Sequence, residues 1–384
     1  MNKSPPLWLL AMISASGTLA MHILAPALHA MSVDLHADPA SVQLTMSIYI
    51  LGVGVSQLFY GPLSDRIGRR PCLIVGMTLY TFAGVAALFA SSIEALIVAR
   101  FVQALGGGSG LVLGRAIVRD CSHGDDTIKK LSLLNLAVVF APAIAPLAGS
   151  ILATTLGWRA IFWVLTYFGA TNLLIVLLLL KETSSGSQKS VIAVLEGYAS
   201  LIFQPRFVSY TFIGGCASAS IYAFIGVASF VFVNQLGRPA YETGFYLALN
   251  IMGIWFGNLT VVRLVARYPI DSLMVRGNLL SCFGASLLFV SALSGHLNLA
   301  LTLSSMLILT YGAGIAAPTA MAQALGVDPS RAGSSSGLYG FAQMGIGAAC
   351  TMLGGIGENH ALAAATTMLG VGLIAQMLHW TTSH

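Results

Sequence analysis

The sequence predicts an all-α polytopic membrane protein with twelve transmembrane helices. Hydrophobic residues make up 57% of the chain and charged residues only 8%, whereas soluble domains carry about 25% charged residues. The apolar residues form stretches of about 18 to 25 residues, enough for an α-helix to cross a hydrocarbon layer of roughly 30 Å. A helix also satisfies its own backbone N–H and C=O groups, which lipid cannot do. These observations exclude a soluble fold.

The apolar stretches fall into two groups of six. The predicted spans are 7–30, 42–63, 72–91, 95–117, 131–153, 159–180, 207–233, 243–265, 273–294, 299–325, 334–357 and 361–380. Because the only polar interval of any length is Glu182 to Gln204, we expect an N-terminal bundle over residues 1–182, a linker over 183–205 and a C-terminal bundle over 206–384. Paired six-helix halves are typical of secondary transporters with a substrate site between the halves. Sequence repetition between the halves is weak.

The basic residues predict the orientation of the chain. Fourteen Lys and Arg residues lie on the side of the N-terminus, and only Arg159 and Arg238 lie on the opposite side. By the positive-inside rule, both termini are expected in the cytoplasm. The net charge of +5 is dispersed over short loops, so we expect the lipid bilayer and a small molecule as partners and no nucleic acid.

The loop between the second and third spans reads Gly61-Pro62-Leu63-Ser64-Asp65-Arg66-Ile67-Gly68-Arg69-Arg70, with one acid among three arginines. Gly61 is expected to allow close approach of a neighbouring helix. Asp65 is expected to pair with a basic group or to lie against a helix N-terminus, where free N–H groups attract anions. The eleventh span, which begins at Gly333 on the same membrane face, would offer such a terminus. The alternative is that the arginines only set the topology.

Two further segments place unusual residues inside spans. Arg100 lies more than one turn inside the fourth span, where an arginine costs several kcal/mol unless it is paired or hydrated. It is therefore a functional candidate, unless it extends to the interface. Pro142 and Pro146 lie in the fifth span, where each removes a backbone donor and is expected to kink the helix.

These segments resemble motifs of the major facilitator superfamily. The Gly61–Arg70 loop matches the signature Gly-x-Leu-x-Asp-Arg-x-Gly-Arg-Arg/Lys at every position, and Arg100-Phe-Val-Gln-Ala-Leu-Gly is similar to the Arg-x-x-Gln-Gly motif. The segment Ala-Pro-Ala-Ile-Ala-Pro-Leu-Ala-Gly149-Ser resembles the Ala-Pro-x-x-Ala-Pro motif of the Bcr/CflA branch of drug–proton antiporters. Most of the likeness lies in the N-terminal half.

The resemblance implies a monomeric exporter of small organic compounds in a bacterial inner membrane, working by alternating access. It would use the proton gradient and no bound cofactor. The resemblance also implies a hinge at Pro142, Pro146 and Gly149. The implied gating residues are Gly61, Asp65, Arg66, Gly68, Arg69, Arg70, Arg115, Arg119 and Asp120.

The positions of the acids change the expected chemistry. All thirteen Asp and Glu residues lie in loops or at helix ends. Members of the Bcr/CflA branch usually carry an acid in the first span, at the position that His22 occupies here. Because histidine titrates near neutral pH, His22 and Arg100 are the candidates for proton coupling; alternatively, His22 is a neutral ring bonded to a neighbouring helix. With two intramembrane arginines and no acid, neutral, zwitterionic or anionic substrates are favoured over cations.

Polar and aromatic residues near span midpoints are the expected substrate-binding side chains. They are His22, Tyr49, Asn135, Tyr222, Asn250, Tyr311, Tyr339 and Gln343. Tyr339 and Gln343 are four residues apart and share a helix face. Each of these residues has the alternative of serving helix packing alone, because a polar group in a membrane helix needs a partner in any case.

Two other functions stay open at the level of the sequence. A permease dedicated to one metabolite, such as an amino acid, nucleoside or sugar, would have the same fold. An intramembrane enzyme or a receptor is a third possibility, but no pair of acids and no Ser/His/Asp set lies at membrane depth. The five cysteines have no metal-like or redox spacing. We therefore expect no metal site, and from the missing catalytic sets we expect no enzyme.

Overall fold

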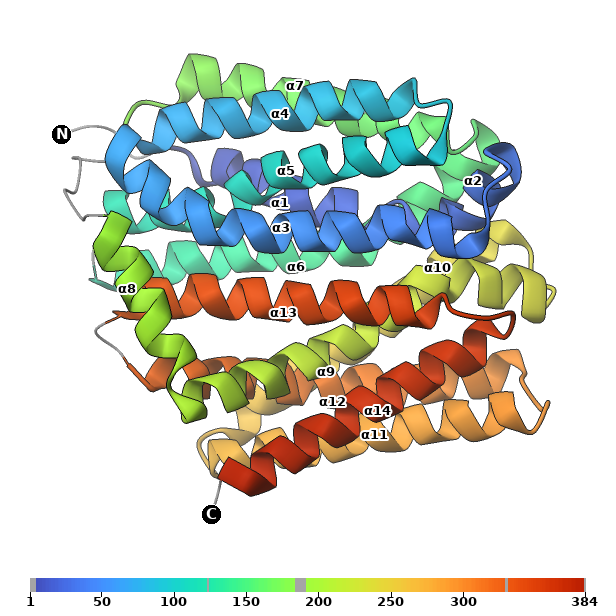
Figure 1. Cartoon of the computed structure of the whole chain (residues 1–384). Coiled ribbons are helices and arrows are strands. Elements are labelled where there is room, and N and C mark those ends of the chain that lie inside the picture. Colours follow the sequence, from blue (N-terminus) through green and yellow to red (C-terminus); the bar gives the residue numbers. More distant parts are fainter. Residues whose placement is uncertain (1–4, 123, 184–190, 329–330, 383–384) are drawn as a thin grey trace.

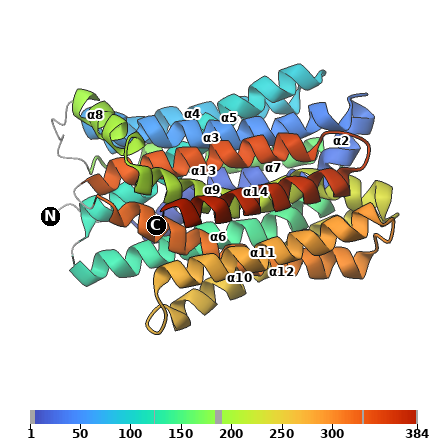
Figure 2. The same ribbon diagram turned by 60° about the horizontal axis from the view of Figure 1, so that its bottom comes forward.

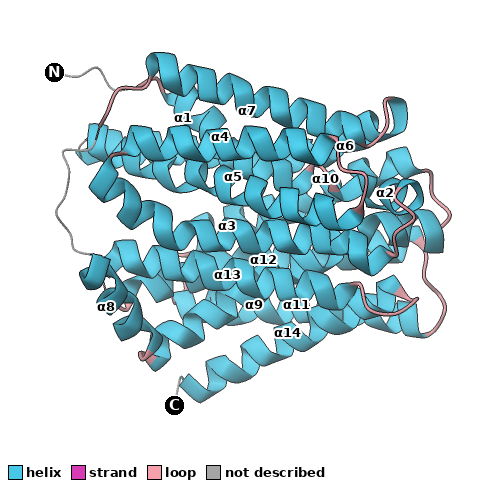
Figure 3. Ribbon diagram, turned by 45° about the horizontal axis from the view of Figure 1, so that its top comes forward, coloured by secondary structure: helices cyan, strands magenta, loops and turns pink. Residues whose placement is uncertain are grey.

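The computed structural model describes residues 5–122, 124–183, 191–328 and 331–382, and its regular structure there is entirely helical (Figure 3). The elements in chain order are α1 (Leu7–His22), η1 (Ala25–Ala27), α2 (Leu28–Asp34), α3 (Pro39–Ile67), α4 (Arg69–Leu88), α5 (Ile93–Cys121), α6 (Gly124–Thr155), α7 (Arg159–Leu179), α8 (Val191–Ile202), α9 (Pro205–Phe230), η2 (Val231–Gln235), α10 (Ala240–Leu264), α11 (Ile270–Leu293), α12 (Leu299–Gly326), α13 (Ala332–Gly354) and α14 (His360–Thr382). The start of α1 and the end of α14 lie at the same end of the bundle, called here the termini end (Figure 1). The opposite end is called the far end.

The long helices correspond to the predicted membrane spans. Within the described residues, eleven helical segments are long and apolar enough to cross a membrane, the first of them being α1, η1 and α2 taken together. The remaining long helix, α13, is 23 residues long but rich in glycine and serine. It packs against α3 and α9, between which it runs in Figure 1 (see also Figure 2). The predicted all-α polytopic fold is confirmed.

Glycines form the same backbone crossing in both halves of the molecule. Between α4 and α5, a Cβ atom added to Gly106 would lie 2.5 Å from the carbonyl oxygen of Gly76. Between α11 and α12, a Cβ atom added to Gly312 would lie 2.5 Å from the carbonyl oxygen of Gly277. Only glycine allows backbones to approach so closely. The internal repeat, weak in the loop sequences, is therefore visible in these crossings.

The two halves meet along two pairs of helices. The helix α3 packs along α13, and α6 packs along α10. The Phe140 and Trp255 rings join the second pair with centroids 6.1 Å apart. At the far end, the Ser150 hydroxyl donates to the carbonyl oxygen of Tyr241 at 2.8 Å. The His29 ring on α2 meets the Phe230 ring on α9 with centroids 6.1 Å apart, so this end of the interface between the halves is closed by direct contacts.

Prolines act differently in two of the spans. The first predicted span is interrupted, because α1 ends at His22 and the chain makes a 3₁₀ turn at Ala25–Ala27 before α2 begins. Pro26 has no N–H to donate to the carbonyl of His22, four residues earlier. In contrast, α6 stays helical through both Pro142 and Pro146. The linker also differs from the expectation of a polar connection, because α8 forms within it and lies across the termini end (Figure 1).

Candidate functional site

The interruption of the first span creates a helix end inside the bundle. The last carbonyls of a helix have no partner within the helix and carry partial negative charge. The Arg100 guanidinium on α5 donates to one of them, the Ala20 oxygen, through Nη2 at 2.9 Å. Its Nη1 donates to Oε1 of Gln103 at 2.7 Å. Among the described residues no carboxylate pairs with this fully buried arginine, which is held instead by the C-terminal end of α1.

Aromatic side chains surround this arginine. The guanidinium carbon of Arg100 lies 3.9 Å from the centre of the Tyr49 ring, a cation–π contact that stabilises a buried cation. The Tyr49 hydroxyl donates to the carbonyl oxygen of Gly17 at 3.0 Å. The Tyr80 hydroxyl donates to the carbonyl oxygen of Ser16 at 3.3 Å. These contacts fix α1, α3, α4 and α5 together around one positive charge.

His22, the last residue of α1, reaches the interface between the halves. Its Nδ1 lies 2.9 Å from the Thr18 oxygen, so Nδ1 donates and Nε2 is the other position for a proton. The His22 ring is 6.5 Å, centroid to centroid, from the Tyr222 ring on α9 of the other half. The structure therefore brings His22 and Tyr222 together. His22 is two residues after Ala20, whose carbonyl holds Arg100.

The other predicted binding residues do not all gather there. Gln343 on α13 donates from Nε2 to the Ser218 hydroxyl at 2.6 Å, one turn before Tyr222 on α9. Tyr49 and Tyr339 are fully buried within their own halves. In this structure both serve packing, because the Arg100 guanidinium covers the Tyr49 ring and the Tyr339 hydroxyl lies between α9 and α12.

Three further predicted residues lie apart from the His22–Tyr222 contact. The Asn135 side chain on α6 is exposed. The Tyr311 hydroxyl is 2.9 Å from the Thr260 hydroxyl, a contact inside the C-terminal half. Asn250 is buried beside Thr310 at a cavity of about 10 Å³, with neither atom of its amide bonded within the described protein. Such a volume holds roughly one water molecule.

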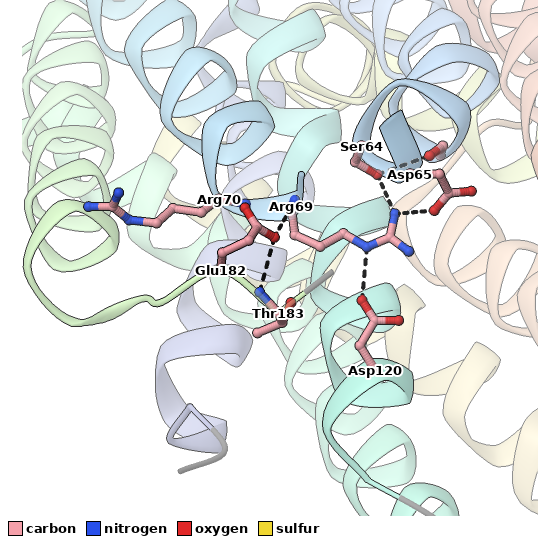
Figure 4. Close-up of polar contacts among 8 residues, drawn as sticks. Ser64, Asp65, Arg69, Arg70, Asp120, Glu182 and Thr183 are labelled. Carbon is pink, nitrogen blue, oxygen red and sulfur yellow. Dashed lines mark hydrogen bonds and ion pairs between the residues drawn. The ribbon is translucent and has the colours of Figure 1, made fainter. Parts of the chain in front are cut away.

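A second polar cluster lies at the termini end, where α3 ends and α4 begins (Figure 4). Arg69 is its centre: Nη1 lies 2.5 Å from a carboxylate oxygen of Asp65 and Nε donates to Asp120 at 2.9 Å. Nη1 also donates to the Ser64 hydroxyl at 2.5 Å. Of the two positions expected for Asp65, the structure shows the pairing with a basic group.

Glu182, which the sequence analysis did not select, completes this cluster. Its carboxylate accepts the backbone N–H groups of Arg69 at 2.8 Å and Arg70 at 3.2 Å, at the start of α4 (Figure 4). An acid at this position satisfies unpaired donors and complements the helix dipole. Gly68 has φ 101°, and a Cβ there would lie 2.4 Å from a Glu182 oxygen. Glycine is thus required both for the turn and for the space.

The side chains of the remaining gating candidates make no contact with the Asp65 or Asp120 carboxylates in the described structure. The expectation that Gly61 allows close helix approach is wrong, because no described atom of a neighbouring helix lies within 4 Å of a Cβ added there. Arg66 and Arg119 are exposed and, like the half-buried Arg115, make no ion pair with the described residues. Arg70 donates from Nη2 to the carbonyl oxygen of Leu177 on α7 at 3.0 Å.

Gly149 has a packing role beside the two prolines of α6. A Cβ added to Gly149 would lie 1.9 Å from the carbonyl oxygen of Ile23, just after the end of α1. The helix that carries the predicted hinge thus packs directly on the interruption of the first span. Within the described residues, no group of three or more His, Cys, Asp or Glu side chains is placed to hold a metal ion.

Comparison with known proteins identifies the family. Residues 8–352 match the profile of the Major Facilitator Superfamily. Multidrug resistance protein D of Escherichia coli is 31% identical over 336 residues, which cover 87% of this chain and 84% of that protein. A bicyclomycin resistance protein homologue of Haemophilus influenzae is 26% identical, covering 82% of this chain and 80% of that protein.

Solved structures show the same fold at low sequence identity. A POT family transporter crystallised with 5-aminolevulinic acid superposes with a TM-score of 0.79 at 14% identity, covering 98% of this chain and 94% of that one. A D-xylose–proton symporter superposes with a TM-score of 0.77 at 14% identity, covering 97% and 96%. With its two six-helix halves and the charged loop between α3 and α4, the chain belongs to the major facilitator superfamily.

Proposed function

We propose that this protein exports small organic compounds from the cytoplasm by alternating access, in exchange for protons. The relatives named for multidrug and bicyclomycin resistance support the drug-like cargo. The positive-inside pattern supports an inner-membrane location with the termini end in the cytoplasm. We further propose that the protein works as a monomer, as a transporter without catalytic activity, and without a nucleic-acid partner.

One observation carries the proposal about the site: α1 ends inside the bundle, at the interface of the halves. Transporters commonly bind substrates and ions where helices are interrupted near the midplane. Here the helix end presents His22 to Tyr222 of the opposite half, while Arg100 holds the preceding turn. A substrate bound between the halves would contact His22, Tyr222 and Gln343, together with Asn135 when the halves separate.

The charges at this helix end favour particular substrates. Arg100 is buried without a carboxylate partner, and the chain has no Asp or Glu in the middle of a span. A permanent cation would find no counter-charge there, so neutral, zwitterionic or anionic compounds fit better. Nε2 of His22 is the proposed site of the exchanged proton, with Arg100 as the fixed charge that disfavours a second cation.

The test is solute-induced pH change in proteoliposomes, measured across a small library of antibiotics and metabolites. We expect several unrelated hydrophobic compounds to induce a pH change. We expect His22→Ala to abolish this proton coupling while substrate binding persists. His296→Ala is the matched control, because His296 is exposed in a far-end loop. Unaltered coupling in His22→Ala would remove the histidine from the mechanism. Movement of a single metabolite, with no response to drugs, would indicate a dedicated permease instead.

A further inference from the structure

A proline in α3 leaves one backbone carbonyl without its partner in the helix. The helix runs from Pro39 to Ile67 and contains Pro62. In an α-helix the N–H of each residue donates to the carbonyl four residues earlier. Pro62 has no N–H, so the carbonyl oxygen of Leu58 has no donor from its own helix. Because this carbonyl is partly shielded from water, it is best satisfied by a donor from elsewhere in the protein.

The linker helix α8 supplies that donor. The Tyr198 hydroxyl donates to the Leu58 oxygen at 2.9 Å. Burial raises the pKa of the Tyr198 hydroxyl above its ordinary value, so the group stays protonated and able to donate. Among the side chains of α8 that the structure describes, Tyr198 makes the hydrogen bond to the N-terminal half.

On its other side, α8 is held by the C-terminal half. Arg331, at the start of α13, donates to the Ser200 hydroxyl. Gly197 packs against Ser334, whose hydroxyl oxygen would lie 3.1 Å from a Cβ added to the glycine. Gly337 of α13 leaves room for the tyrosine, because a Cβ there would lie 3.2 Å from the Tyr198 hydroxyl oxygen. The hydroxyl thus lies between α3 of one half and α13 of the other.

We propose that Tyr198 is a positioning residue of the transport cycle, which fastens α3 to α13 at the termini end through the carbonyl that Pro62 leaves free. The bond stabilises the conformation in which this end is closed. It must break when the cytoplasmic ends of α3 and α13 separate. The inference rests on the proposed alternating access, and it assigns to the linker a part in setting the balance between the two conformations.

The experiment measures the separation of α3 and α13 directly. Spin labels are placed at Ile67→Cys, where the side chain is exposed, and at Gly333→Cys, which faces open space, in a background without the five native cysteines. Since one hydrogen bond contributes about 0.5–1.5 kcal/mol, Tyr198→Phe should raise the ratio of open to closed populations by about 2- to 10-fold. Pro62→Ala should do the same, because the new N–H takes the Leu58 carbonyl.

The double variant tests whether both changes act on one contact. Adding Tyr198→Phe to Pro62→Ala should produce no further opening. Gly337→Ala places a Cβ 3.1 Å from the Gln57 carbonyl oxygen of α3 and 3.2 Å from the Tyr198 hydroxyl oxygen, so it should also favour the open state. Tyr210→Phe is the matched control, since Tyr210 packs against the buried cluster that contains Ile213 and Cys216 within the C-terminal half. An unchanged distance distribution in Tyr198→Phe, or full additivity with Pro62→Ala, overturns the proposal.

Transport supplies the second readout. Tyr198→Phe should change kcat and leave the KM for the transported compound unchanged, whereas a purely structural residue would alter thermal stability alone. The distance measurement uses the protein without substrate. A failure to transport drugs would therefore count against the proposed function, and an unaltered distance distribution against the role of Tyr198.

Discussion

The two halves share a backbone crossing but differ in the side chains that surround it. At the crossing of α4 and α5, Tyr80 is fully buried and its hydroxyl reaches the Ser16 carbonyl of α1. At the crossing of α11 and α12, the corresponding residue is Ser281, whose hydroxyl donates to the Leu309 carbonyl at 2.8 Å. The Tyr80 hydrogen bond therefore joins the crossing to a third helix, α1. The Ser281 hydrogen bond joins only the two crossing helices, α11 and α12.

A second pair of equivalent positions, six residues before the crossing glycines, holds a buried charge in one half and an apolar side chain in the other. Arg100 lies six residues before the crossing glycine Gly106, and Met306 lies six residues before Gly312. Both side chains are buried, but Arg100 binds the end of α1 whereas Met306 lines the small cavity beside Asn250. The repeated fold therefore depends on small residues at crossings, while the buried charge at this position belongs to the N-terminal half.

The largest effect is expected from adding a methyl group to the glycine at each helix crossing. Gly106→Ala and Gly312→Ala each place a Cβ 2.5 Å from backbone atoms, so each should lower the free energy of unfolding by about 3 kcal/mol, the upper range for overpacking. Thermal unfolding in detergent measures the effect. Gly370→Ala in α14, with open space around its Cβ, is the control. Tolerance of one crossing variant but not the other would show that the crossings are not equivalent.

Arg100→Met makes the N-terminal half resemble the C-terminal half. We expect transport to fall at least about tenfold, equivalent to roughly 1.4 kcal/mol in the barrier. Replacing a buried charge by an apolar side chain of similar size is often nearly neutral for stability, so the protein should still fold. Proton-coupled flux and thermal unfolding are measured on the same preparation. Full transport by the methionine variant would contradict a functional role for the charge.

A smaller effect is expected at the loops of the termini end. Asp65→Asn removes the charge that Arg69 contacts, and it should slow turnover several-fold without much loss of substrate affinity. The C-terminal half offers Asp271→Asn as a comparison, since Asp271 accepts a hydrogen bond from Gln323 at 2.7 Å and lies outside the Arg69 cluster. Turnover and affinity are measured separately in proteoliposomes. An Asp65→Asn variant with an unchanged turnover rate would refute gating by this carboxylate.

The smallest effect concerns the start of α4. Glu182→Gln keeps the oxygen that accepts a backbone N–H but removes the charge, which near a helix N-terminus contributes about 0.3–1 kcal/mol. Hydrogen exchange should therefore become faster by a few-fold in the first turn of α4 only. Glu196→Gln on the exposed side of α8 serves as control. Equal exchange in both variants would indicate that the charge at Glu182 does not stabilise the helix.

The sequence predicted the fold well, because the length and apolarity of a span depend on neighbouring residues alone. The contacts of each polar residue, in contrast, depend on residues far away in the sequence. Arg100 was recognised as costly without a partner, yet its partner is the Ala20 carbonyl, which is free only because α1 ends at His22. Pro26, four residues after His22, was the available signal for that ending.

Other features of the site had no signal in the sequence. Tyr49 and Tyr339 lie near span midpoints, but the direction in which a hydroxyl points depends on helix rotation, and both are buried inside their halves. Glu182 contacts Arg69 and Arg70 across more than one hundred residues of chain. An acid just after the sixth span would suggest this contact only once the ends of α4 and α7 are known to be neighbours.

The preference for neutral cargo, which follows from the lack of a carboxylate within the spans, has an energetic consequence for the cell. If a neutral compound leaves while His22 carries one proton inward, each cycle moves one positive charge across the bilayer. The membrane voltage then drives export directly, by roughly 2.3 kcal/mol for every 100 mV. At equal internal and external pH, efflux of neutral cargo would thus continue, and it would stop only when the voltage is collapsed as well.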